Sequence, residues 1–226
     1  MYGDERGQQP VDPVATSEDC CRWAYNYSQQ GNTNAAIEMY NRALGWNPAN
    51  PHAHVGMGEI LFNSGNFAEA ERAFNEAIRL APNEPGAYCD KGYLYMEQGR
   101  FDEAIPVLTR AIMVDPNYFE GFELLGGTYM AKGKTHEALQ YLQRAIVLND
   151  QSLYAVAMLA ILMGQLRRYE EAYQFADKGL ELDQGHKYAL VLSQVKEYAV
   201  KEFEKAQRTP VQKYIDFIQA WKKMKW

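Results

Sequence analysis

Small and large apolar residues return at fixed intervals along most of the chain. Alanines recur every 34 residues, and a large apolar residue follows most of them by four positions. The alanines are Ala36, Ala70, Ala104, Ala138 and Ala172, and the residues that follow are Tyr40, Phe74, Leu108 and Leu142, with Ala176 in the fifth copy. Residues four positions apart share one face of an α-helix. The pattern therefore predicts a series of repeated helices.

Helix breakers and further small residues follow the same period. A small residue recurs where two helices would meet, at Ala24, Gly58, Gly92, Gly126 and Ala160. Residues suited to ending helices recur at Gly31, Gly65, Gly99 and Gly133, and at Pro48, Pro82 and Pro116. Each unit is therefore predicted to be a hairpin of two helices that approach closely at the small residues. The large residue of the second helix is expected to fill the space toward the next repeat.

The repeated pattern resembles that of the tetratricopeptide repeat (TPR) family. Tyr27, Tyr95 and Tyr129 occupy the aromatic place of the first helix, and the segment from Gly58 to Pro82 is close to the family consensus. The resemblance implies an all-α fold, a right-handed α-solenoid of five helix-turn-helix repeats with C-terminal capping helices. The repeats are predicted within residues 17–184, at approximately 17–50, 51–84, 85–118, 119–152 and 153–186.

The segments that flank the repeats follow other patterns. Residues 1–16 contain two prolines and few apolar side chains, and they are predicted to form a disordered tail. Arg167 replaces the usual glycine in the fifth repeat, which departs most from the pattern. Residues 187–208 are expected to form a capping helix, because terminal repeats expose apolar surface that needs a cover. Residues 209–226 are predicted to form a basic amphipathic helix that starts at Thr209–Pro210.

Charge is distributed unevenly, although the net charge of the chain is only −6. Residues 185–226 carry nine Lys or Arg and four Asp or Glu, which leaves −11 for the rest of the chain. An acidic repeat region argues against nucleic acid as a partner. The most apolar stretch, Leu153–Leu166, is shorter than the roughly 20 residues that span a bilayer, and no secretory signal is expected. A cytoplasmic setting is predicted, with peripheral attachment to a membrane or organelle surface through partners left open.

No catalytic residue, cofactor site or metal site is predicted. His52 and His54 are two residues apart on an expected helix, so their side chains point in different directions. Cys20 and Cys21 are adjacent and do not readily form an unstrained disulfide. The glycines that follow Leu125 lie inside an expected helix with no preceding strand, which argues against a phosphate-binding loop. A non-enzymatic protein is therefore expected.

The resemblance to the TPR family implies a concave groove lined by the first helix of each repeat. The residues expected to bind a partner there are Tyr25, Glu59, Phe62, Tyr93, Met96, Glu97, Glu123, Met130, Tyr154, Met158 and Ile161. Asp90 and Glu120 fall on the same predicted face. Cys21, Tyr25 and Asp90 stand where family members that grip chaperone tails carry basic or amide residues. The resemblance therefore disfavours that specialisation.

An apolar groove with an acidic rim suits a particular class of ligand. Acidic rims attract basic ligands, and methionine-rich surfaces adapt to varied apolar side chains. The expected partner is another protein, which contributes a peptide or amphipathic helix with basic flanks. The leading interpretation is a non-catalytic adaptor or assembly scaffold. The alternatives are a self-assembling scaffold on a protein coat or organelle surface, a substrate-holding chaperone for secretion or complex assembly, and a regulatory subunit of an enzyme.

The last 18 residues themselves resemble the expected ligand. Their apolar residues recur at helical spacing and their net charge is positive. The apolar positions are Val211, Tyr214, Ile215, Ile218 and Trp221, and the lysines are Lys213, Lys222, Lys223 and Lys225. Two arrangements follow from the sequence. Residues 209–226 either dock on repeat-derived surface, within the same chain or through self-association, or they extend the cap and contact only the preceding helix.

Overall fold

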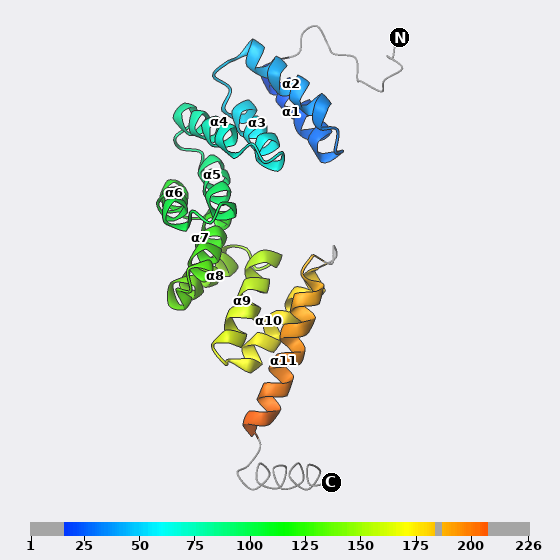
Figure 1. Cartoon of the computed structure of the whole chain (residues 1–226), viewed down its shortest axis with the longest axis vertical. Helices are drawn as coiled ribbons and strands as arrows, with labels where there is room; N and C mark the ends of the chain where they lie inside the picture. The colour runs from blue at the N-terminus through cyan, green and yellow to red at the C-terminus, as the bar shows by residue number, and fades with distance from the viewer. Residues whose placement is uncertain (1–15, 184–186, 208–226) are drawn as a thin grey trace. The chain divides into compact units, whose positions relative to one another are not determined.

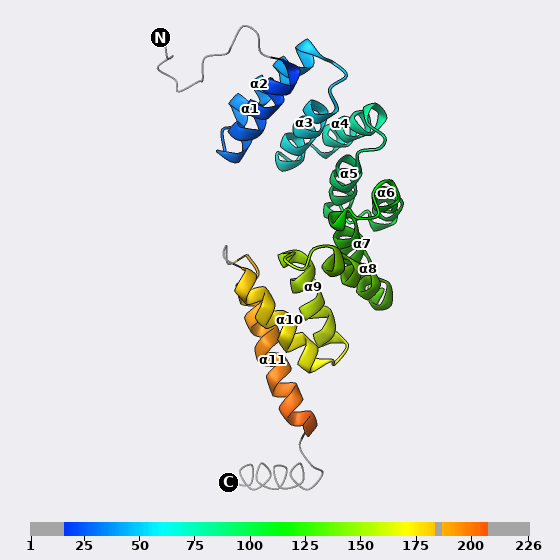
Figure 2. The same cartoon turned by 180° about the vertical axis from the view of Figure 1, so that it is seen from behind.

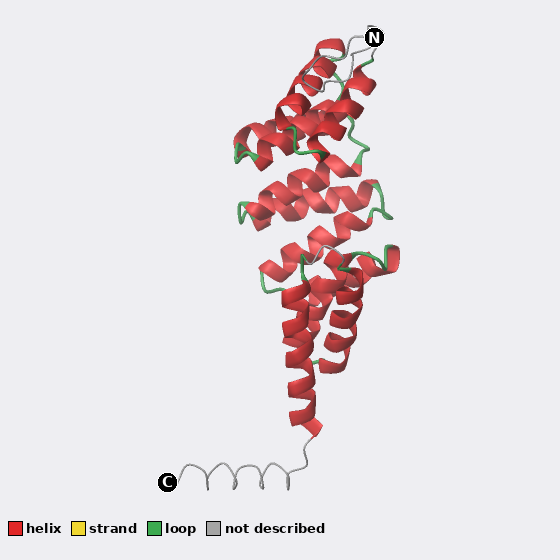
Figure 3. Cartoon of the chain, turned by 90° about the vertical axis from the view of Figure 1, so that its right-hand side faces the viewer, coloured by secondary structure: helices red, strands yellow, loops and turns green. Residues whose placement is uncertain are grey.

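The computed structural model describes residues 16–183 and 187–207 (Figure 1). Eleven α-helices and no strand make up these residues (Figure 3), which confirms the predicted all-α class. The predicted N-terminal tail, apart from residue 16, and the predicted C-terminal basic helix lie outside the described residues.

Ten of the helices form five successive pairs with the period found in the sequence. The first helices have 13 residues each and are α1 (Ser17–Gln29), α3 (Pro51–Asn63), α5 (Pro85–Glu97), α7 (Phe119–Ala131) and α9 (Leu153–Gln165). The second helices have 14 residues each and are α2 (Thr33–Trp46), α4 (Phe67–Leu80), α6 (Phe101–Val114), α8 (Thr135–Leu148) and α10 (Tyr169–Leu182). The spacing of helix starts is therefore 34 residues throughout.

The turn inside each hairpin requires a left-handed backbone. Gly31, Gly65, Gly99 and Gly133 have φ values of 75°, 79°, 71° and 70°. Glycine adopts this conformation without the steric cost that a β-carbon brings. The fifth hairpin uses the same geometry without a glycine, because Arg167 has a φ of 59°. Arg167, which replaces the glycine of the repeat pattern, is therefore a point of backbone strain.

Small residues on the first helices admit large side chains from the second helices. A β-carbon added at Gly58 would lie 2.6 Å from the ring of Phe74, and one added at Gly126 would lie 2.6 Å from Cγ of Leu142. Both large residues belong to the same hairpin as the glycine that they cover. Tyr40 is different, because its ring crosses Gly56 of the following hairpin. The predicted contact toward the next repeat is thus seen for Tyr40, whereas Phe74 and Leu142 pack against their own repeat.

The chain divides into two compact units, residues 1–124 and 125–226, and the division falls inside α7. In the first unit the hairpins α1–α2, α3–α4 and α5–α6 follow one another (Figure 2). The first helices are neighbours, because α1 contacts α3 and α3 contacts α5. In the second unit, a buried cluster of Ala157, Ala160, Ala176 and Leu192 joins α9, α10 and α11.

The last described helix, α11 (Ala189–Gln207), covers the fifth hairpin. It lies along α10 and also contacts α9, so that Leu192 and Ala199 are buried (Figure 1). The carboxylate of Asp183 accepts hydrogen bonds from the backbone N–H groups of Lys187 and Tyr188, at 2.9 and 2.8 Å. These bonds fix the two residues that directly precede the helix, where the backbone N–H groups have no partner within it. The helix begins at Ala189, two residues later than the sequence predicted.

Candidate functional site

Aromatic side chains from successive first helices meet in the first unit. The rings of Phe62 on α3 and Tyr93 on α5 have centroids 5.4 Å apart, and Phe67 lies 5.8 Å from Phe62. Tyr93 is 42% exposed and Phe62 is half-buried, so part of this cluster faces solvent. We call the surface of α1, α3, α5 and the start of α7 that carries these residues the first-helix face.

An acidic residue precedes each of these two aromatic residues by three positions. Glu59 precedes Phe62 on α3, and Asp90 precedes Tyr93 on α5. Residues three apart lie on the same side of a helix, close to one turn apart. The two acidic groups are near enough for the charge of Glu59 to influence Asp90, just as the two rings touch. The first-helix face therefore presents an acidic pair beside an aromatic pair.

The environment of Asp90 disfavours its negative charge. Burial raises the pKa of this carboxyl to about 7, and the nearby charge of Glu59 adds to the effect. The pKa of Glu59 is also raised by the surrounding protein, although its side chain keeps contact with solvent. Loss of hydration penalises the ionised form of a carboxyl group unless a cation or hydrogen-bond donor compensates for it. A positively charged group placed here would supply that compensation.

Further carboxylates lie where α7 meets α5. Cys89 is buried, and its burial, followed by the charges of Asp90, Glu120 and Glu123, raises the pKa of the thiol well above its ordinary value. Burial and then the charge of Glu120 raise the pKa of Tyr118 in the same way. Such a thiol stays protonated and is a poor nucleophile. The surroundings of Cys89 therefore favour electrostatic binding over covalent chemistry.

One carboxylate oxygen at this place lacks a hydrogen-bond partner. Oε2 of Glu120 is buried and has no partner in the described part of the chain. A buried polar atom without a partner costs free energy, about 1–3 kcal/mol for a typical group and more for a charged one. A donor that arrives with a ligand would remove this cost. Together with Asp90, Glu120 therefore marks the acidic end of the first-helix face as a place suited to a cationic group.

Tyr40 of α2 lies beneath this face, and the repeat pattern did not identify its place beside Glu59. Its ring crosses Gly56, and burial and the charge of Glu59 raise the pKa of its hydroxyl to about 12. The pattern assigns Tyr40 only to the core, where its ring is indeed 4% exposed. The absence of a side chain at residue 56 was the available signal, because a glycine opposite a tyrosine lets the phenol cross to the neighbouring helix.

The other predicted binding residues differ in their surroundings. Tyr25 and Glu97 are exposed, Met96 is half-buried, and Glu123 is buried with 8% of its surface exposed. Met130, Tyr154, Met158 and Ile161 belong to the second unit and are each half-buried. Met158 packs against the cluster shared by α9, α10 and α11, so part of its surface is internal. Among the residues of this face, the rings of Phe62 and Tyr93 are in contact, and Glu59 is near enough to raise the pKa of Asp90.

The described residues lack the arrangements that metal binding and membrane crossing require. The described residues contain no group of three or more His, Cys, Asp or Glu side chains placed to hold a metal ion. Cys20, Cys21 and Cys89 are free thiols. Within residues 16–183 and 187–207, no helix combines the length and apolar character needed to cross a bilayer. The chemistry that the first-helix face offers is thus that of aromatic rings and carboxylates.

Comparisons with known proteins agree with the repeat pattern. A family model described as "Tetratricopeptide repeat" matches residues 27–89, 65–126 and 95–152, which together span more than half of the chain. The comparison with curated proteins gave no match.

Several solved structures are similar to this chain. TTC0263, a thermophilic TPR protein of Thermus thermophilus, is 22% identical with a TM-score of 0.68, over 80% of this chain and 98% of that one. The pilF protein of Pseudomonas aeruginosa is 19% identical with a TM-score of 0.68, and the likeness covers 90% of this chain and 97% of that one. YrrB, described as a TPR protein with an unusual peptide-binding site, is 20% identical with a TM-score of 0.56, and the likeness covers 79% of this chain and 92% of that one. At these identities the likeness concerns the fold alone.

Proposed function

Because this chain belongs to the tetratricopeptide repeat family, a generally non-catalytic fold for protein interaction, we propose that it is an adaptor or assembly scaffold. The proposal places the bound partner on the first-helix face. The partner is a protein segment that carries basic and apolar side chains, as an amphipathic helix or an extended peptide. The peptide-binding site for which YrrB is described offers a parallel for this use of the fold.

The juxtaposition of two pairs of residues supports this proposal most strongly. The rings of Phe62 and Tyr93 touch at 5.4 Å, and one turn away Glu59 disfavours the ionisation of Asp90. An apolar side chain of the partner would cover the rings and displace water from them. A lysine or arginine three or four positions along a partner helix would reach the acidic pair. One amphipathic turn therefore complements both pairs at once.

The net charge of the repeat region favours the same class of partner. Residues 1–184 carry a net charge of −11. A surface with an excess of one charge raises the rate at which oppositely charged ligands arrive, and this effect weakens as salt is added. The partner is expected to associate faster at low ionic strength, as a basic segment would.

Capture of partners by matched variants tests the proposal. The wild-type protein, the double variant Phe62→Ala/Tyr93→Ala and the control Trp46→Ala would each be used to recover proteins from a lysate of the source cells. Trp46 is an exposed aromatic residue at the end of α2, which is a second helix and not one of those that form the first-helix face. Specific partners should be recovered by the wild type and by Trp46→Ala, and be lost with the double variant. Recovery that is equal for all three proteins contradicts a role for this face.

The other roles expected from the sequence remain predictions. A self-assembling scaffold would form large homo-oligomers, which light scattering detects without any partner. A substrate-holding chaperone would suppress aggregation of unfolded clients, whereas an adaptor would bind one folded partner with defined stoichiometry. A regulatory subunit would change the activity of a co-purifying enzyme. The cytoplasmic setting is likewise a prediction, which fractionation of the source cells tests.

A further inference from the structure

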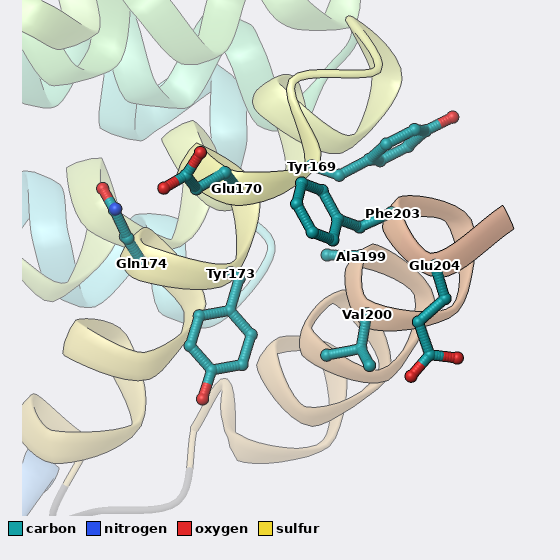
Figure 4. A pocket seen from close by; sticks show the side chains of 8 residues that line it. All are labelled: Tyr169, Glu170, Tyr173, Gln174, Ala199, Val200, Phe203 and Glu204. Atoms are coloured by element: carbon teal, nitrogen blue, oxygen red, sulfur yellow. The ribbon is translucent and has the colours of Figure 1, made fainter. Parts of the chain in front are cut away.

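A groove of about 590 Å³ lies between α10 and α11 in the second unit. Its walls come from the first half of α10 and the last half of α11. The lining residues are Tyr169, Glu170, Tyr173, Gln174, Ala199, Val200, Phe203 and Glu204. Figure 4 shows the ring of Phe203 extending from α11 to a place beside Tyr169. Tyr173 of α10 and Val200 of α11 lie on the two walls of the groove. The groove is separate from the first-helix face, which belongs to residues 1–124.

Large apolar side chains of α11 remain uncovered at this groove. The helix buries Leu192 and Ala199, yet Val200 and Phe203 are each 42% exposed. Tyr198, whose ring packs edge-on against Tyr169 at 5.9 Å, is also exposed. Contiguous exposed apolar surface on a protein usually marks a place where another segment binds. Helix α11 therefore covers the fifth hairpin, but some of its own apolar side chains stay exposed to solvent.

The lining of the groove is acidic as well as apolar. Glu170 on α10 and Glu204 on α11 are both exposed, and neither forms an ion pair in the part of the chain that the structure describes. Neighbouring carboxylates are already paired, Glu171 with Arg168 and Glu202 with Lys205. The unpaired carboxylates favour an occupant that brings lysine or arginine beside its apolar side chains.

The sequence that follows α11 has this character. Residues 209–226 contain four lysines and one aspartate, with apolar residues at helical spacing from Val211 to Trp221. Helix α11 ends at Gln207, one turn beyond the groove residues Phe203 and Glu204. Antiparallel helices are commonly joined by two to five residues, and three residues, 208–210, separate α11 from Val211. The segment therefore starts at the edge of the groove and is long enough to return along it.

We propose that residues 211–225 dock in the α10–α11 groove of the same molecule as an amphipathic helix. The apolar side of the segment covers Tyr173, Val200 and Phe203, and its lysines approach Glu170 and Glu204. A short connection gives the segment an effective concentration on the order of millimolar, which favours its own groove over that of a second copy. This docking uses another surface than the first-helix face and requires no other protein, so it does not depend on the proposed binding of a partner.

Amide hydrogen exchange of the full chain, followed by mass spectrometry, tests this docking. In the wild type, amides of residues 211–223 should exchange about tenfold or more slowly than in a free peptide of the same sequence. Phe203→Glu places a charge on the apolar wall and should abolish this protection. Leu190→Glu makes the same change on α11 at a side chain that is 72% exposed and outside the groove, and should leave the protection intact.

Two further measurements keep the proposal open to refutation. Glu204→Lys should reduce the protection, and Lys213→Glu, at the start of the docked segment and so opposite Glu204 in an antiparallel hairpin, should restore part of it. Amides of α9 and α10 should stay protected in every variant, which shows that the fifth hairpin remains folded. If Phe203→Glu loses this protection of α9 and α10, Val200→Glu takes its place as the test of the groove. Absence of protection in the wild type, or equal loss in Phe203→Glu and Leu190→Glu, overturns the proposal. Protection that appears only together with a dimeric mass in light scattering assigns the groove to a second copy and also overturns it.

Discussion

Replacement of Asp90 by Asn should stabilise the protein, and increasingly so as the pH rises. Loss of hydration at the half-buried Asp90, with the nearby charge of Glu59, raises the pKa of its carboxyl to about 7 in the folded chain. An unfolded aspartate titrates near about 3.9. Between these two values the unfolded chain releases the proton while the folded chain keeps it, so stability falls as the pH rises. Asparagine has the shape of the protonated aspartate and does not ionise, so the variant does not lose stability in this way as the pH rises.

The size of the effect follows from the two pKa values. Each pH unit between about 3.9 and 7 costs about 1.4 kcal/mol, which gives up to roughly 4 kcal/mol once both states are ionised. We expect Asp90→Asn to raise the free energy of unfolding by about 2–4 kcal/mol at pH 8 and to have little effect near pH 4. The groups that face this region, Glu59, Glu120 and Glu123, are unchanged in the variant, so a difference curve isolates Asp90.

Urea unfolding of the wild type and the variant, measured from pH 4 to pH 8, gives this difference curve directly. Glu69→Gln serves as the control, because it removes one charge from an exposed position of α4. The control should stay within about 0.5 kcal/mol of the wild type at each pH. A constant difference between Asp90→Asn and the wild type across this range would refute the assigned environment of Asp90.

Three other substitutions test the repeat itself. Gly126→Ala should destabilise the chain by about 1–3 kcal/mol, because its β-carbon would lie 2.6 Å from Cγ of Leu142. Gly164→Ala, also in a first helix but with no atom within 4 Å of the added carbon, should stabilise it by about 0.5–1 kcal/mol. Arg167→Gly should raise stability by about 0.5–1 kcal/mol, since glycine removes the strain of a φ of 59°. Thermal unfolding measures all three, and equal effects of the two Gly→Ala changes would contradict the packing described for Gly126.

The period of the repeat could be recognised from the sequence because it reflects close packing. Gly58 and Gly126 are required where Phe74 and Leu142 press against the first helix, and glycines are required at left-handed turns. These constraints are local: a small residue recurs in each hairpin, as alanine in the first and fifth, and the turn glycine recurs in the first four. The same reasoning marked Arg167 as an exception, and the structure shows that the backbone keeps its geometry there.

The first-helix face, where we propose that the partner binds, was only partly predictable, because it depends on contacts between repeats. The sequence placed Phe62 and Tyr93 on the same face, and their rings do touch. The pattern predicted that Tyr40 fills the space toward the next repeat, but it did not show that the hydroxyl of Tyr40 comes near Glu59, nor that Asp90 loses enough hydration to raise its pKa to about 7. Those properties arise from the offset between neighbouring helices and from burial, and a repeat pattern specifies neither.

Photo-crosslinking from the first-helix face tests the central claim most directly. A photoreactive aromatic amino acid would replace Tyr93 in one protein and Trp46 on α2 in another, both exposed positions. The proposal predicts that the probe at residue 93 labels a defined partner segment with basic and apolar side chains, and that the probe at residue 46 does not. Labelling of that segment should weaken below pH 7, as Asp90 takes up its proton. Equal labelling from both positions, or labelling from residue 46 alone, would contradict binding on the first-helix face.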